Sequence, residues 1–220
     1  RRENLLSELA LGLRSRHKIE VVEHALDLGN MTSVRDLVSS MNQDIGLLVY
    51  NAAYSPIGYF KDVPYADLEH IISVNIQTPL FLIKTLTEPM LQRGKGGIIL
   101  MSSLSGIQGS PKIATYAASK SFNIVLAEGL WHELKGLNVD IMACVAGAVR
   151  TPGYMTSANE KDAPGTLDPN EVVEETLAAL GSSPSLTPGS FNRFAKFIMS
   201  RLLPRKRAIR IMHNNTKDLR

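Results

Sequence analysis

The sequence is poor in the residues that build disulfides and metal centres. Its 220 residues hold one cysteine, Cys144, which excludes an internal disulfide and a cysteine-clustered zinc or iron–sulfur site. The five histidines are scattered without HExxH or a comparable ligand spacing, so we expect no metal. No apolar run reaches the roughly 18 residues of a membrane-spanning helix, and the opening RRENLLSELA is too charged for a signal peptide. These absences predict a cytoplasmic protein.

What the sequence does have suits a globular α/β protein with an uneven charge distribution. Hydrophobic residues make up 44% of the chain and charged residues 20%, enough for one sizeable core. Residues 191–220 carry nine Lys or Arg and one acid, whereas residues 1–190 carry fifteen Lys or Arg and twenty acids. Nucleic-acid-binding proteins spread basic residues over a binding face with aromatic platforms. Basic residues gathered in one terminal segment therefore predict no nucleic-acid partner.

Helical and strand patterns alternate along the chain. Helices are expected at 2–16, at 32–43 with Thr32 as its cap, and at 64–93, 112–135 and 169–180; strands are expected at 19–28, 46–50, 98–101 and 139–145. Such alternation predicts a doubly wound parallel sheet covered on both faces, a Rossmann-type α/β fold. Ligands bind such sheets at the carboxyl ends of the strands. Residues 152–168 are expected to form a loop of lid-like length.

One pair of side chains on the helix at 112–135 can move a proton. Tyr116 and Lys120 are four residues apart, which puts them on one helix face, close to the loop that carries Ser103. A phenol of ordinary pKa, about 10, is a poor acid or base at neutral pH, and a neighbouring ammonium stabilises the phenolate. A serine hydroxyl can hold a reacting carbonyl or alcohol oxygen beside the phenol. Lys120 is therefore expected to lower the pKa of Tyr116.

In the order and spacing of these features the sequence resembles the short-chain dehydrogenase/reductase family over residues 1 to about 180. Ser103, Tyr116 and Lys120 match three members of the family's active-site tetrad, and Asn75 in Ser-Val-Asn-Ile is similar to the fourth. Asn51-Ala52-Ala53 looks like its Asn-Asn-Ala-Gly turn, and Asp27-Leu28 falls where the family places its adenine-ring acid. Residues 146–151, Ala-Gly-Ala-Val-Arg-Thr, resemble its Pro-Gly-x-Val-x-Thr.

The resemblance implies hydride transfer between a nicotinamide ring and a carbonyl or alcohol substrate. Tyr116 would be the acid/base, Ser103 would hold the substrate oxygen, Lys120 would tune Tyr116 and contact the ribose, and Asn75 would hold a water. The implied cofactor-binding residues are Arg2, Asp27, Leu28, Asn51, Ala52, Tyr116, Lys120, Val149 and Thr151. Arg1-Arg2 looks like the family's basic pair that meets the 2′-phosphate, which favours NADP and leaves NAD as the alternative.

One part of the family pattern is missing from the sequence. The family opens with a strand, a Thr-Gly-x-x-x-Gly-x-Gly turn and a helix that hold the pyrophosphate, and the only glycine cluster here, 94–97, comes after a helix and before a strand. We therefore expect the first strand, the glycine-rich turn, the first helix and the second strand to be absent, and the chain to be a fragment of a longer reading frame. The strand at 46–50 would then expose an apolar edge.

The basic terminal segment allows more than one interpretation. Residues 191–212 alternate apolar and basic side chains around Pro204, which predicts an amphipathic helix pair that docks on the parent domain, on a second subunit, or on an anionic membrane surface. We expect an incomplete Rossmann-type domain at 1–189, a helical extension at 190–220, and by resemblance a homodimer or homotetramer. A non-catalytic Rossmann-like interaction or membrane-surface module is the alternative to an oxidoreductase.

Overall fold

The chain divides into two compact units, Arg1–Asn42 and Gln43–Arg220. The computed structural model describes residues 3–157 and 162–216, and each unit is described by itself. Among the described residues, no helix has both the length and the apolar character needed to cross a bilayer.

The first unit is a pair of helices joined by irregular chain. Helix α1 runs over Glu3–His17 and helix α2 over Met31–Ser40. The prediction of Thr32 as the N-cap is wrong. The N-cap is Asn30, two residues earlier, and its side chain accepts a hydrogen bond from the Ser33 amide at 3.2 Å. Arg14 holds the joining segment by donating to Glu23 Oε2 at 2.6 Å.

The strand expected at 19–28 does not form. Residues 18–27 have no regular secondary structure, although their apolar and β-branched composition favours a strand. A strand satisfies its backbone N–H and C=O groups by pairing with a neighbour, and the described part of this unit contains no strand to pair with. The strand-favouring composition of this segment is therefore not enough to form a strand without a neighbouring strand to pair with.

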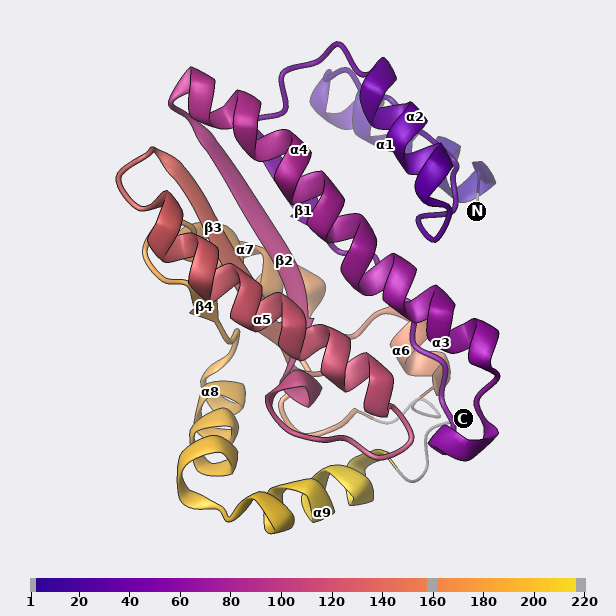
Figure 1. Cartoon of the computed structure of the whole chain (residues 1–220), viewed down its shortest axis with the longest axis vertical. Helices are drawn as coiled ribbons and strands as arrows, with labels where there is room; N and C mark the ends of the chain where they lie inside the picture. Colours follow the sequence, from indigo (N-terminus) through magenta and orange to yellow (C-terminus); the bar gives the residue numbers. More distant parts are fainter. Residues whose placement is uncertain (1–2, 158–161, 217–220) are drawn as a thin grey trace. The chain divides into compact units, whose positions relative to one another are not determined.

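The second unit is built on a parallel sheet in the order β1-β2-β3-β4. The strands are β1 Leu47–Tyr50, β2 Gly96–Ser103, β3 Val139–Ala146 and β4 Ser185–Leu186. The predicted doubly wound α/β class is confirmed: Figure 1 shows α4 (Thr78–Arg93) and α5 (Ala114–Leu134) in front of the sheet and α7 (Pro169–Ala179) behind it. The outer edge of the sheet is β1, with Leu47 and Val49 exposed.

The remaining helices follow the predicted pattern with three differences. Helix α3 (Tyr65–Ile72) passes through a π-helical stretch, Ser73–Gln77, into α4, as the continuous 64–93 pattern predicted. The glycine cluster at 94–97 is divided between two elements, because Gly94 caps α4 whereas Gly96 and Gly97 already belong to β2. At Gly96 a Cβ would lie 2.5 Å from the Met90 side chain, so only glycine lets α4 and β2 approach so closely. The expected loop at 152–168 instead begins with helix α6, Pro152–Ser157, and β4 had no counterpart among the predicted strands.

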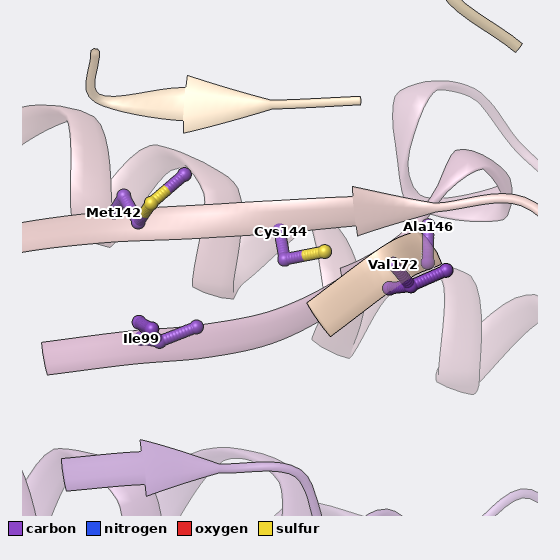
Figure 2. Packing of buried hydrophobic residues seen from close by; sticks show 5 residues of the cluster. All are labelled: Ile99, Met142, Cys144, Ala146 and Val172. Atoms are coloured by element: carbon purple, nitrogen blue, oxygen red, sulfur yellow. The ribbon is translucent and has the colours of Figure 1, made fainter. Parts of the chain in front are cut away.

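Two cores lie on the two faces of the sheet. Figure 2 shows the cluster on the α7 side, where Val172 of α7 packs over strand residues; its members are Ile99, Met142, Cys144, Ala146 and Val172. On the other face, α5 packs against β2 and β3. The single cysteine is part of the first cluster and fully buried. Strands β2 and β3 are therefore packed on both faces.

The chain ends in two short helices of the same unit. Helix α8 covers Ser190–Phe197, a π-helical stretch covers Ile198–Leu202, and α9 covers Arg205–Thr216. The break between them falls at Pro204, which cannot continue the hydrogen bonding of the preceding helix.

Candidate active site

Parallel strands bring three predicted segments to one edge of the sheet. Asn51 follows β1, Ser103 is the last residue of β2, and Ala146 is the last residue of β3. Ser103 pairs directly with Ala146 in the register of β2 and β3. In α/β sheets this edge is where ligands bind, so the segments expected to carry chemistry lie at the expected edge.

Helix α5 adds Tyr116 and Lys120 to this edge. Both lie in its first two turns, and Lys120 Nζ is 5.5 Å from the centre of the Tyr116 ring. The Tyr116 hydroxyl is hydrogen-bonded to the Ser103 side chain. Lys120 is only 3% exposed and donates to the Met101 carbonyl at 2.7 Å. The structure therefore brings together Ser103, Tyr116 and Lys120.

Ser103 is held by a neighbour that the sequence pattern did not single out for this task. Its Oγ accepts a hydrogen bond from the Ser105 amide at 3.2 Å and another from the Ser105 hydroxyl at 3.0 Å. Ser105 is the second residue of the short 3-10 turn Leu104–Ile107, and it is buried. Because both of these bonds are accepted, the Ser103 proton is available for donation, and it is directed to the Tyr116 hydroxyl.

Asn75 is linked to this group through the hydrogen bonds of a neighbouring residue. Its amide is fully buried in the π-helical stretch, donates to the Tyr54 carbonyl and to Ser119 Oγ at 2.9 Å each, and accepts from the Tyr54 amide at 2.8 Å. Ser119 in turn donates to the Tyr116 carbonyl at 2.8 Å. Asn75 therefore ties the loop after β1 to the α5 turn that carries Tyr116. Tyr54 and Ser119 were not predicted, because only tertiary packing brings them to Asn75.

Burial controls the protonation of the two titratable groups. It raises the pKa of Tyr116, and the hydrogen bond from Ser103 opposes this only in part. It lowers the pKa of Lys120 from 10.5 to about 8. The expectation that Lys120 sets a lowered pKa on Tyr116 is wrong for the protein without ligand, since desolvation decides the direction. At neutral pH, Tyr116 carries its proton and Lys120 is mostly charged.

The other predicted cofactor residues occupy the rim of the site. Asn51 is exposed and Ala52 half-buried just beyond β1. Val149 forms an isolated parallel bridge with Leu167. Thr151 is exposed, and its Oγ1 accepts from the Tyr154 amide at 3.2 Å.

Three predicted cofactor residues fall in the first unit. Asp27 Oδ1 accepts a hydrogen bond from the Gly29 amide at 2.9 Å, which closes a turn directly before α2, and Leu28 is part of that turn. Arg2 lies outside the described residues. Their cofactor roles stay predictions. Among the described residues, no group of three or more His, Cys, Asp or Glu side chains could hold a metal ion.

Sequence comparison finds related proteins over most of the chain. The family model for short chain dehydrogenase matches residues 1–162. A 7beta-hydroxysteroid dehydrogenase of Clostridium sardiniense is 29% identical over 196 residues, which is 88% of this chain and 75% of that protein. A very-long-chain 3-oxoacyl-CoA reductase of Anas platyrhynchos is 26% identical over 227 residues, covering 100% of this chain and 71% of that protein.

Structure comparison agrees. A structure from work on 7beta-hydroxysteroid dehydrogenase stereoselectivity superposes with a TM-score of 0.90 at 26% identity, covering 96% of this chain and 84% of that one. A short-chain dehydrogenase from Sphingobium yanoikuyae in complex with NADPH has a TM-score of 0.73 at 24% identity, covering 86% and 74%. The second likeness shows the fold alone.

Proposed function

This chain belongs to the short-chain dehydrogenase family and is an oxidoreductase, and we propose that it transfers a hydride between a nicotinamide cofactor and a carbonyl or alcohol carbon. The observation that carries the proposal is the contact of Ser103, Tyr116 and Lys120 at the carboxyl edge of the sheet. A protonated phenol, a hydroxyl donor and a buried cation in one place suit the protonation of an oxygen that is gaining negative charge.

Each residue of this group has a separate task in carbonyl reduction. Ser103 donates a hydrogen bond to the substrate oxygen and holds it beside the phenol. Tyr116, which keeps its proton because burial raises its pKa, would donate that proton to the carbonyl oxygen as the carbonyl carbon gains a hydride, which leaves an alcohol and a phenolate. The Lys120 ammonium stabilises the phenolate that remains. Asn75 is a positioning residue, since it acts on Tyr116 only through Ser119.

The residues at the edge of the sheet fit the nicotinamide end of a dinucleotide. The buried Lys120 ammonium and the exposed polar side chains Asn51 and Thr151 offer donors and acceptors of the kind that a ribose and a carboxamide need, and Ala52 and Val149 add apolar contacts. When bound, the nicotinamide supplies or accepts the hydride. NADP is favoured over NAD by Arg2, with Asp27 and Leu28 proposed at the adenine end.

An apolar substrate is the class that the site favours. A small pocket adjoins Tyr116, and its walls are mostly apolar; they include Pro56, Phe60, Val63, Leu68 and Ile113. Two relatives are named for hydroxysteroids and for very-long-chain 3-oxoacyl-CoA. Both kinds of compound carry an oxygen on a large apolar skeleton. We extend this class, a ketone or secondary alcohol on an apolar body, to the present chain.

The same proposal covers the organisation of the molecule. We assign residues 1–189 to an incomplete Rossmann-type domain and residues 190–220 to its basic extension, and we expect two or four copies to assemble. The apolar outer face of α5 supports assembly, because it forms a groove that the exposed Val125 lines.

The decisive experiment compares two tyrosine variants of the full chain. Tyr116→Phe removes the proton donor and keeps the ring, and we expect NADPH-dependent reduction of apolar ketones to fall at least about 100-fold. Tyr65→Phe removes a phenol that is 73% exposed at the start of α3 and does not line the pocket, and it should leave the rate unchanged. Equal rates for wild type and Tyr116→Phe would refute the assigned chemistry, as would an unaltered NADPH fluorescence when the chain is added.

A further inference from the structure

Helix α8 and the π-helical stretch that follows it expose apolar side chains where a helix usually exposes polar ones. Phe194 is 64% exposed, Phe191 and Phe197 are each 53% exposed, and Leu202 is 60% exposed. The buried residue of α8 is instead polar: Asn192 is 3% exposed and donates to the Gly165 carbonyl at 2.9 Å. Helix α8 is therefore amphipathic with its aromatic side turned outward; in Figure 1 it lies at the lower left, above α9.

The charge of this region has one sign. Residues 191–216 include seven Lys or Arg and no Asp or Glu. Arg193 forms an ion pair with Glu175 at 2.7 Å, and Lys196 interacts with Glu128. Four further cations are exposed: Arg201, Lys206, Arg207 and Arg210. In the described part of the chain, none of them forms an ion pair with a carboxylate. Exposed phenylalanines and unpaired cations thus occur together in the segment 191–216.

The segment is held in place and is not a loose tail. Arg205 donates to the Ile107 carbonyl at 2.7 Å, and the Thr216 hydroxyl donates to the Pro111 carbonyl at 2.9 Å. Ala208 is fully buried on the inner side of α9. These bonds fix α9 against the loop between β2 and α5, so its cationic outer side has a defined orientation.

We propose that this aromatic–basic surface, made of Phe191, Phe194, Phe197, Leu202, Arg201, Lys206, Arg207 and Arg210, docks on an anionic lipid bilayer. The phenylalanines enter the boundary between headgroups and acyl chains, while the basic side chains pair with lipid phosphates. Charge complementarity selects this occupant. In a two-fold interface between copies the same surface would face itself, and its uncompensated cations would repel one another.

Vesicle sedimentation of the full chain tests the proposal. The probe is a phosphatidylcholine vesicle with or without phosphatidylglycerol, and we expect binding only to the anionic vesicle. Binding should weaken as salt rises, because the Debye length falls from about 10 Å at 0.1 M to about 3 Å at 1 M. Phe194→Gln with Phe197→Gln should lower the bound-to-free ratio about tenfold or more, and Arg207→Gln with Arg210→Gln about tenfold.

Matched variants separate this surface from general stickiness. Phe60→Gln with Tyr65→Gln removes two comparably exposed aromatics elsewhere, and Lys84→Gln with Lys95→Gln removes two exposed cations; both should bind like wild type. Circular dichroism checks that every variant is folded. The proposal fails if no anionic vesicle binds the chain, if both vesicle types bind equally, or if the phenylalanine variant changes only the oligomeric state or nucleic-acid binding.

Discussion

Lys120 is a buried cation that costs the folded protein stability. It is 3% exposed, and burial lowers its pKa from 10.5 to about 8. Between these two values the unfolded chain binds more protons than the folded one, so the free energy of unfolding rises with pH across this window. At about 1.4 kcal/mol per pKa unit, the cost at neutral pH is on the order of 3 kcal/mol. Such a cost is retained where a charge has a functional task.

Replacing this lysine should therefore stabilise the protein and abolish its chemistry. Lys120→Met keeps the length of the side chain and removes the charge, while losing the bond to the Met101 carbonyl. We expect a net gain of about 2 kcal/mol at pH 7, read as a higher Tm. The gain should shrink as the pH rises from 8 towards 10, because wild-type Lys120 then loses its proton. Oxidoreductase activity should fall by at least about 100-fold.

Lys84→Met serves as the control for this experiment, because Lys84 is exposed on α4. Its Tm difference from wild type should be small and should not depend on pH. A Lys120→Met variant whose stability difference stays constant from pH 7 to 10 would contradict the depressed pKa of Lys120.

The site shows which residue contacts local spacing can predict. Tyr116 and Lys120 share a face because they are four residues apart on one helix, a relation that needs no tertiary structure. The contacts of Ser103 with Ser105, and of Asn75 with Ser119, depend on how a strand end and a π-helical stretch pack against α5. No spacing rule contains these distances, so the supporting residues were not predicted.

Among the elements, long buried ones were predictable and marginal ones were not. Helices α4 and α5 and strands β2 and β3 carry sustained apolar patterns, and their predicted positions are confirmed within a few residues. The apolar run at 19–28 was mistaken for a strand because pairing, and not composition, decides whether a strand exists. Strand β4 is only two residues long and is defined by its register with Ala143 and Cys144, which no local pattern records.

One junction between elements depends on a single side chain. Asn192 of α8 lies between the exit of β3 and the loop before α7: a Cβ at Gly147 would lie 2.8 Å from its amide, and a Cβ at Gly165 would lie 2.4 Å from its Oδ1. Its amide also donates to the Gly165 carbonyl. The junction braces the segment that carries Val149 and Thr151.

We expect Asn192→Ala to loosen this junction. Loss of a buried hydrogen bond that leaves a carbonyl unsatisfied should cost about 1–3 kcal/mol, measured as a lower urea midpoint. Asn214→Ala, on the exposed side of α9, is the matched control and should change the midpoint little. An Asn192→Ala midpoint equal to that of wild type would show that the junction is held by other contacts.

On the level of the whole molecule, two exposed apolar surfaces differ in charge and therefore in the partner they suit. The aromatic–basic surface carries uncompensated cations. The groove on α5 is instead lined mostly by small and apolar side chains, with one acid at its end; its residues are Ala118, Ser121, Phe122, Val125, Leu126, Gly129, Leu130 and Glu133. A two-fold pairing of this face brings no set of like charges together at its centre, and Ala118 and Gly129 allow close approach. The α5 face is thus the one suited to a second copy.

Val125→Glu tests this assignment, because Val125 is 64% exposed and lines the groove. A two-fold axis would place the two new carboxylates against each other in an apolar interface, where burying unpaired charge is strongly unfavourable. Sedimentation velocity should show the wild-type oligomer and a monomeric variant. Val173→Glu puts the same change on α7, at a valine that is 53% exposed, and should leave the oligomer intact. If wild type sediments as a monomer, or if Val173→Glu dissociates it and Val125→Glu does not, copies do not meet through α5.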